Sequence, residues 1–153
     1  MPDNDYGRIV RLLILTGCRR DEIGSLRWSE IDNESRLIAL PGERTKNSRT
    51  HDVPLSKAAP EIIDSIPRRM NSDFVFGEGK GGFSGWSKAK AALDIQLGLK
   101  PWRLHDLRRT ASTRMADAGV QIVIEVVINH ISGHKAGVAG VYNRSTYENE
   151  KRA

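Results

Sequence analysis

Cysteine is nearly absent from this sequence of 153 residues, in which Cys18 is the only one. A single cysteine excludes an internal disulfide framework and suits a reducing cytoplasm, where we expect the protein. No apolar run approaches a transmembrane span and no secretory signal opens the chain, so we expect no membrane partner. Internal repeats and low-complexity tracts are also missing. These absences leave one globular domain with its own core.

Acidic residues are fewer than basic ones, with 19 Asp and Glu against 24 Lys and Arg and a formal net charge of +5. The excess is concentrated between Lys100 and Met115, where five basic residues accompany one acid, Asp106. This excess favours a polyanionic partner, nucleic acid first. On charge alone, a solvated basic surface is an equally good interpretation.

Two helices are predicted at the start of the chain. The first carries the apolar run 9–15, is capped by Asp3, Asn4 or Asp5, and is ended by Gly17. Because its apolar side chains lie nearly all round, we expect it to be buried. A second, short helix opens with acidic residues 21 and 22. Arg19 is therefore expected at a tight junction between two helices.

Short strand-like runs follow at Ile31, 36–40 and 50–55, and they predict a small antiparallel sheet whose hairpin carries residues 45–48. A helix is predicted at 58–66 and an extended piece at 74–76. The glycine-rich segment 77–82 lacks a GxxxxGK[ST] pattern, so we interpret it as a plain surface loop. The predicted fold class is α+β and mostly α-helical.

Three further helices are predicted in the second half of the chain. One starts at Ser84 or Ser87 and ends at Gly98, and a basic one runs from Leu104 to about Ala118 and stops at Gly119. The β-branched run 122–128 favours a strand by propensity, but its helical neighbours lead us to expect a helix.

The basic helix carries the pair on which the functional hypothesis depends. Its apolar stripe is Leu104, Leu107, Ala111, Met115 and Ala118. His105 and Arg108 are expected off that stripe and, three residues apart, next to one another on one face. An imidazole beside a permanently charged guanidinium can hold a carboxylate or a phosphate.

Other chemistry-bearing residues lie on other elements: Arg19 at the helix junction, Lys46 on the hairpin, His130 after the β-branched run and Tyr142 near the end. Each alone has an ordinary structural explanation, such as a cap, a hairpin-tip lysine or a packed tyrosine. Together, several cationic groups around one tyrosine suggest phosphoryl transfer through a tyrosine nucleophile.

At this point the sequence resembles the catalytic domain of tyrosine recombinases, the phage-type integrases, over essentially its whole length. The resemblance rests on blocks in family order: TGCRRDE at 16–22, TKN at 45–47 followed by VPL at 53–55, HDLR at 105–108, NH at 129–130 and VAGVY at 138–142. The distance from His130 to Tyr142 exceeds that of the family's compact members, and residues 132–137 look like a loop insertion of phage-type relatives.

The resemblance implies a role for each matching residue. Tyr142 is the nucleophile that forms a 3′-phosphotyrosyl link, and Lys46 is the general acid for the leaving 5′ oxygen. The phosphate is held by the remaining catalytic residues, Arg19, Arg108, His105 and His130. His105 also accepts the tyrosine proton, and Glu22 supports the site. No metal or cofactor is implied. We further expect DNA contacts from five arginines: Arg20, Arg44, Arg49, Arg103 and Arg109.

The resemblance also implies double-stranded DNA as the partner and a homotetramer on paired DNA sites. Residues 1–153 would be a catalytic-domain fragment without the N-terminal DNA-binding domain of such enzymes, and a monomer is one of the states left open for the fragment alone. Two alternatives stay open: a non-catalytic DNA-binding integrase remnant and a type IB topoisomerase-like activity. A zinc site at His130 and His134 is disfavoured, because Ser132 and Gly133 interrupt a helix and the HExxH glutamate is missing.

Overall fold

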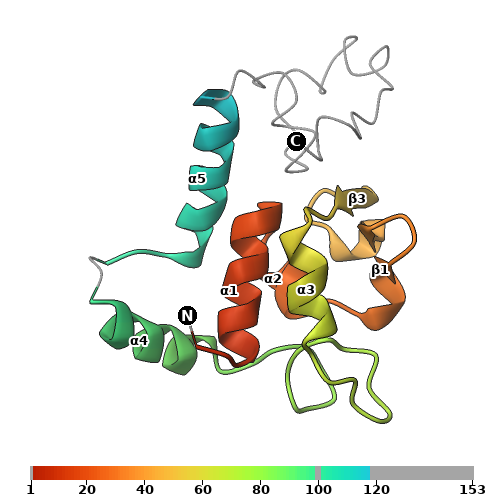
Figure 1. The fold of residues 1–153 in the computed structure, drawn as a ribbon, viewed down its shortest axis with the longest axis horizontal. Helices are drawn as coiled ribbons and strands as arrows, with labels where there is room; N and C mark the ends of the chain where they lie inside the picture. The colour runs from red at the N-terminus through yellow and green to blue at the C-terminus, as the bar shows by residue number, and fades with distance from the viewer. Residues whose placement is uncertain (1, 99–100, 118–153) are drawn as a thin grey trace.

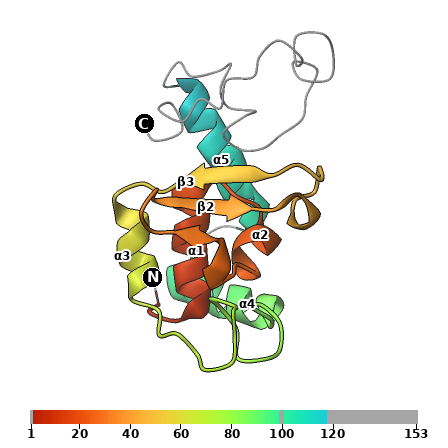
Figure 2. The same cartoon turned by 90° about the vertical axis from the view of Figure 1, so that its right-hand side faces the viewer.

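The structure is a computed structural model that describes residues 2–98 and 101–117. Figures 1 and 2 show a small sheet that lies against one side of a group of helices. The elements in order are α1 (Asp5–Thr16), α2 (Arg20–Gly24), the 3₁₀ turn η1 (Trp28–Glu30), β1 (Ile31–Asp32), β2 (Leu37–Leu40), the 3₁₀ turn η2 (Gly42–Arg44), β3 (His51–Pro54), α3 (Ala58–Asp64), α4 (Trp86–Leu97) and α5 (Leu104–Asp117). The prediction of an α+β, mostly helical fold is confirmed.

Helix α1 is central and contacts α2, α3 and α5. In Figure 1, α5 lies on one side of α1 and the sheet on the other. The caps of α1 were predicted correctly, because Asn4 accepts a hydrogen bond from the Gly7 N–H at 2.9 Å and Gly17 ends the helix with φ of 63°. The expectation of a helix buried all round is wrong. Ile14 and Leu15 are 49% and 39% exposed.

The three predicted strands form one antiparallel sheet in the order β1-β2-β3. In its register Ile38 faces Val53 and Leu40 faces His51. These four side chains are buried and the intervening Ala39 and Asp52 are exposed, as expected for a sheet with one covered face. The predicted extended piece is also present, since Val75 N–H donates to the Leu26 carbonyl at 2.8 Å. Residues 45–48 lie on the β2–β3 connection as predicted.

Helices α3, α4 and α5 follow the predicted order. The predicted start of α4 is wrong, because its N-cap is Gly85 and no side chain caps it. Gly98 ends α4 with φ of 58°, as predicted. Helix α5 begins at Leu104, and Leu104 and Leu107 pack against the core. The predictions for residues 118 and 119, for 122–128 and for the loop 132–137 lie outside the described residues.

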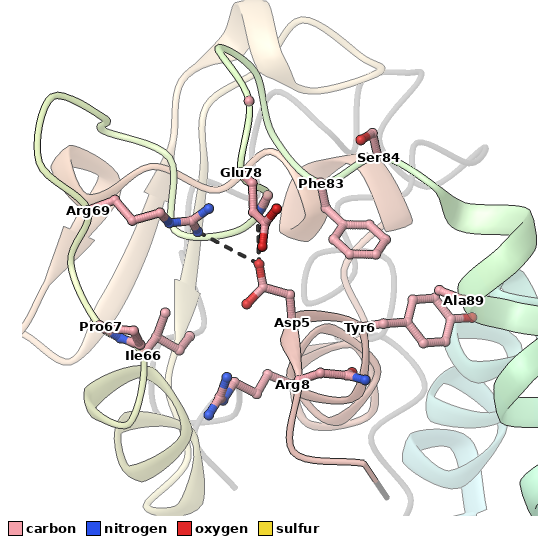
Figure 3. A pocket seen from close by; sticks show the side chains of 13 residues that line it. Asp5, Tyr6, Arg8, Ile66, Pro67, Arg69, Glu78, Phe83, Ser84 and Ala89 are labelled. Atoms are coloured by element: carbon pink, nitrogen blue, oxygen red, sulfur yellow. Dashed lines mark hydrogen bonds and ion pairs between the residues drawn. The ribbon is translucent and has the colours of Figure 1, made fainter.

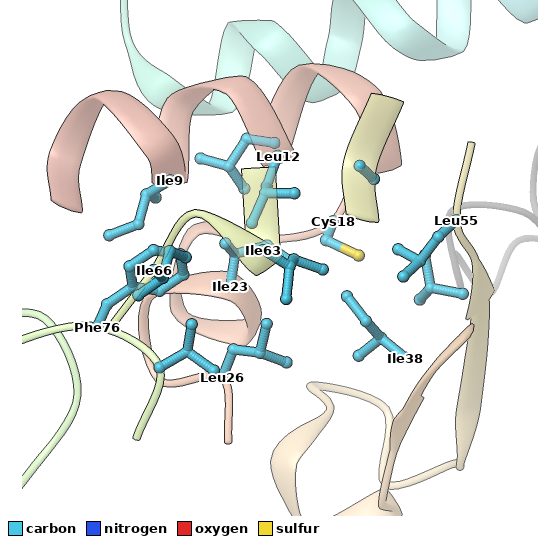
Figure 4. Close-up of a cluster of buried hydrophobic side chains, with 14 of the residues drawn as sticks. Ile9, Leu12, Cys18, Ile23, Leu26, Ile38, Leu55, Ile63, Ile66 and Phe76 are labelled. Atoms are coloured by element: carbon cyan, nitrogen blue, oxygen red, sulfur yellow. The ribbon is translucent and has the colours of Figure 1, made fainter. Parts of the chain in front are cut away.

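One apolar core joins α1, α2, the sheet, α3 and the 74–76 segment (Figure 4). A second cluster, built on Tyr6, Val10 and Leu93, packs α4 against α1 with the help of Phe83, Trp86 and Trp102. Within the described ranges, no helix has the length and apolar character needed to cross a membrane.

Candidate active site

Arg19 and Glu22 form a reciprocal pair at the junction of α1 and α2. The backbone N–H of Arg19 donates to Glu22 Oε2 at 2.7 Å, and its guanidinium Nη1 donates to Glu22 Oε1 at 2.8 Å. Glu22 is 3% exposed, so this carboxylate is buried and charge-paired. The αL turn at Gly17 and the capping box together fix the direction in which Arg19 leaves the backbone.

Arg108 was expected to lie off the apolar stripe of its helix, on an unpacked face. The structure corrects this expectation, because the Arg108 side chain on α5 is buried. Only 6% of it is exposed, and its Nη1 donates to the Gly17 carbonyl at 2.7 Å. Burial lowers the pKa of the guanidinium, the nearby Arg19 lowers it further, and Glu22 opposes the shift. Glu22 is therefore the shared counter-charge of the two arginines. The guanidinium stays charged because arginine titrates far above neutral pH.

His105 lies one turn before Arg108 on α5 and is exposed. The start of this helix is fixed locally, because the Arg103 N–H donates to Asp106 Oδ2 at 2.9 Å. His105 is therefore offered to solvent on the first turn, while Arg108 is anchored one turn further along.

Lys46 lies on the connection between β2 and β3, and its side chain is exposed. The hydroxyl of the preceding Thr45 holds this connection together. It donates to the Arg49 carbonyl at 2.7 Å and accepts from the Arg49 N–H at 3.1 Å. The backbone beneath Lys46 is thus closed into a compact loop, whereas the long side chain extends from it.

A surface hollow of about 550 Å³ brings the four predicted side chains together. It is lined by Arg19, Lys46, His105 and Arg108, together with Cys18, Arg20, Asp21, Trp86, Ser87, Lys90, Trp102, Arg103 and Leu104. Two guanidinium groups, an ammonium and an imidazole at one open hollow can bind an oxyanion such as a phosphodiester. The lining residues that were not predicted as part of a site are Cys18, Asp21, Trp86, Ser87, Lys90, Trp102 and Leu104.

Three of the unpredicted lining residues take part in two cation–aromatic pairs at the hollow, one of them with the predicted Arg20. Arg20 lies over the Trp86 ring at 5.2 Å, and Lys90 Nζ lies over the Trp102 ring at 4.1 Å. Lys90 also pairs with Asp94 at 2.6 Å. No single-residue signal could have found these pairs, since each joins residues of two segments that are far apart in the sequence or on different elements.

Four of the five arginines expected to contact DNA are exposed, and one is not. Arg20 and Arg103 line the hollow, and Arg49 and Arg109 are exposed. Arg44 instead makes internal contacts, with Glu30 and with the carbonyls of residues 21 and 22. Arg44 therefore holds parts of the structure together, whereas the other four arginines lie at its surface.

His130 and Tyr142, the remaining predicted site residues, lie outside the described residues. Among the described residues, no group of three or more His, Cys, Asp or Glu side chains is placed to hold a metal ion.

A second hollow lies near the N-terminal end of α1, and none of the predicted site residues lines it (Figure 3). Two of its charged groups, Asp5 and Arg69, are engaged with one another. Asp5 accepts a hydrogen bond from the Gly77 N–H at 2.8 Å and pairs with Arg69 at 3.7 Å. Arg69 also donates to the Val75 carbonyl at 2.7 Å. This end of the molecule is a structural junction between α1 and the 67–77 segment.

Comparison with known sequences gives the same family on two grounds. The model of the phage integrase family matches residues 5–149. Prophage integrase IntZ of Escherichia coli K12 is 36% identical over 94% of this chain, and the shufflon-specific DNA recombinase of E. coli is 34% identical over 84%. The chain spans only about a third of these relatives, 36% and 31% of their lengths.

Solved structures share the fold. The integrase from mycobacterium phage Brujita superposes with a TM-score of 0.68 at 21% identity, over 88% of this chain and 46% of its own. The Tn1549 transposon integrase in complex with circular intermediate DNA superposes with a TM-score of 0.61 at 16% identity, over 84% and 51%. With the family model matched along almost the whole sequence, the chain belongs to the phage integrase family.

Proposed function

We propose that residues 1–153 are the catalytic domain of a site-specific DNA recombinase that cleaves and rejoins strands through a 3′-phosphotyrosyl intermediate. The observation that carries the proposal is the shared hollow of Arg19, Lys46, His105 and Arg108, which come from three separate segments of the chain. The names of the relatives, integrases and a DNA recombinase, point in the same direction.

The two arginines are suited to the charge that develops on an attacked phosphodiester. Each is fixed before substrate arrives, Arg19 by Glu22 and Arg108 by the Gly17 carbonyl. Preorganised donors cost no reorganisation during the reaction, and one such donor typically contributes roughly 3–4 kcal/mol. We assign the non-bridging oxygens to Arg19 and Arg108, with hydrogen bonds from His105 and His130 beside them.

In the cleavage step, the Tyr142 hydroxyl oxygen attacks the scissile phosphorus and His105 accepts the phenol proton. The bond from phosphorus to the 5′ oxygen breaks, and the new bond joins phosphorus to the tyrosine oxygen. Lys46 donates a proton to the departing 5′ oxygen, which leaves as a hydroxyl. One phosphodiester is exchanged for another, so rejoining needs no external energy source. The 5′ hydroxyl of a second strand reverses the same steps.

The partner we propose is double-stranded DNA, held by Arg20, Arg49, Arg103 and Arg109 around the hollow. The solved Tn1549 integrase, described as a complex with DNA, supports this choice. Because the chain spans about a third of its curated relatives, we place it within a longer protein with a separate N-terminal DNA-binding domain. Strand exchange then takes place in a tetramer on paired sites.

The test is a suicide DNA substrate incubated with the full-length protein. We expect a covalent adduct that survives denaturation and that Tyr142→Phe abolishes. Tyr6→Phe is the matched control, because Tyr6 packs against Phe83 and Trp86 and burial, with a contribution from Asp94, raises its pKa to about 12. This variant keeps the adduct if Tyr142 is the nucleophile.

Other outcomes would contradict the proposal in distinct ways. Salt-sensitive duplex binding with no adduct in the wild-type protein would indicate a non-catalytic DNA-binding remnant. An adduct with relaxation of supercoiled DNA but no exchange between sites would indicate a topoisomerase-like activity. Loss of the adduct in Tyr6→Phe but not in Tyr142→Phe would show that Tyr142 is not the nucleophile.

A further inference from the structure

Arg44 is the least exposed of the five arginines first expected to contact DNA, and its side chain joins two elements of the site. It ends η2, two residues before Lys46, and only 13% of its side chain is exposed. Its Nη1 pairs with Glu30 Oε2, and its Nη2 donates to the Glu22 carbonyl at 3.0 Å and to the Asp21 carbonyl at 3.4 Å. One planar guanidinium therefore spans a carboxylate and the end of α2.

The two ends of this link both lead to proposed catalytic residues. On one side, Glu22 offers its carbonyl to Arg44 and its carboxylate to Arg19. On the other side, the Thr45 hydroxyl oxygen also lies 3.1 Å from the Gly42 carbonyl oxygen and 3.0 Å from Asn47 Oδ1, acceptors that share its one proton with the Arg49 carbonyl, and these contacts close the loop that carries Lys46. Arg44 thus connects the segment that fixes Arg19 to the loop that presents Lys46.

The far partner of Arg44 is itself immobilised. Glu30 is 7% exposed, and its Oε2 also accepts the Arg27 N–H at 2.9 Å at the start of η1. Through Glu30, the link reaches η1 and β1, which pairs with β2 in the sheet from which the loop leaves. The hairpin base is consequently held at a set distance from α2.

From these contacts we infer that Arg44 is a positioning residue for Lys46, which keeps the general acid in register with the phosphate held by Arg19. The inference rests on the proposed function. A lysine at position 44 would keep the positive charge opposite Glu30, but a single ammonium cannot span the carboxylate and two carbonyls. Misplacing a reacting group by about 1 Å can cost roughly 100-fold in rate. Arg44→Lys should therefore slow the step that needs Lys46.

The test compares two suicide DNA substrates in single-turnover cleavage by the full-length protein. They differ in one atom, because the second carries sulfur in place of the 5′ bridging oxygen. A thiol has a pKa of about 8.5, so it leaves as a thiolate without a general acid. Lys46→Ala is the reference variant, and it should cleave the oxygen substrate roughly 10²- to 10⁴-fold more slowly than the wild-type protein does. It should cleave the sulfur substrate close to the wild-type rate.

Arg44→Lys should follow Lys46→Ala in pattern, with a loss of roughly 10- to 100-fold on the oxygen substrate and near wild-type cleavage of the sulfur substrate. The double variant Glu30→Gln/Arg44→Ala should behave likewise. It removes the ion pair without leaving a buried carboxylate alone, so it guards against a variant that simply unfolds. Arg68→Ala, which removes one positive charge at the Trp28 ring and outside the hollow, should cleave both at the wild-type rate.

The inference is overturned if Arg44→Lys slows both substrates equally, since the defect would then lie in phosphate binding or in the fold. It is also overturned if Arg44→Lys cleaves the oxygen substrate at the wild-type rate. If Lys46→Ala is not rescued by sulfur, Lys46 is not the general acid and Arg44 has nothing to position. If the wild-type protein forms no adduct, the proposed function itself fails.

Discussion

Cys18 precedes Arg19 in the chain, but its thiol lies in the core among Ile38, Ile63 and Leu55 (Figure 4). Burial raises its pKa from the ordinary value of 9.0 to about 12, and Glu22 adds to the rise. An acid whose pKa is higher in the folded state stabilises the fold below the unfolded pKa. That stability is lost as the pH rises through the interval between the two values.

Above roughly pH 9, we therefore expect the free energy of unfolding of the wild-type protein to fall by about 1.4 kcal/mol more per pH unit than that of Cys18→Ala. Urea denaturation of both proteins at intervals from about pH 8 to 10.5 measures this difference. Cys18→Ala starts from a lower stability because it loses core contacts, so the slopes are compared rather than the absolute values. Parallel curves across the interval would contradict the raised thiol pKa.

Arg108 shows what the sequence could and could not predict about a single residue. Its identity and its place one turn after His105 were readable from the sequence. Its burial was not, because apolar periodicity registers only apolar side chains and its acceptor, the Gly17 carbonyl, is 91 residues away. An arginine can be buried only where the fold provides a partner for its charge and its hydrogen bonds, and that partner cannot be identified before the fold is known.

The same distinction holds for whole elements. Asn4, Gly17 and Gly98 were predicted as helix ends because each acts on its own helix, within four residues. The start of α4 was predicted wrongly, since serine is only a preferred cap and here Gly85, with φ of 80°, turns the chain into the helix. The hairpin with Lys46 was predicted, but the internal role of Arg44 depends on how η2 packs on α2.

The contact between α2 and α4 gives a prediction at this scale. Gly24 lies so close to Trp86 that a Cβ added at Gly24 would lie 2.4 Å from Cζ2 and 2.7 Å from Cη2 of the Trp86 ring. The Trp86 ring packs edge-on against Phe83 and Tyr6, which restricts its movement. Gly24→Ala should therefore destabilise the protein by about 1–3 kcal/mol, as overpacking usually does. Urea denaturation measures the loss.

Two comparisons separate this clash from a general effect of alanine. Gly79→Ala should change stability little, because a Cβ there would meet nothing within 4 Å. In a Trp86→Phe background the outer ring atoms are gone, so Gly24→Ala should cost clearly less than in the wild type. The coupling in this double-mutant cycle should be of the order of 1 kcal/mol. Additive effects would place the cause elsewhere.

At the scale of the whole molecule, basic residues serve two different purposes. Some are paired with buried or partly buried acids and hold elements together, as Arg44 does with Glu30 and Arg69 with Asp5. Others, such as Arg49 and Arg103, are exposed. A net charge of +5 is shared between these groups, so the number of contacts to the proposed DNA partner cannot be read from composition. It depends on which arginines the fold leaves at the hollow.

The salt dependence of DNA binding measures how many basic residues at the hollow contact phosphates. Each phosphate neutralised contributes about 0.9 to the slope of log Kobs against log salt on duplex DNA. Arg103 is exposed and lines the hollow, so Arg103→Ala should lower the slope by roughly 0.9 and weaken binding of all sequences alike. Arg68→Ala removes the same charge outside the hollow and should leave the slope unchanged. Titrations of a short duplex from about 50 to 200 mM salt test both variants. Equal changes in the two slopes would mean that overall charge, and not the hollow, holds the DNA.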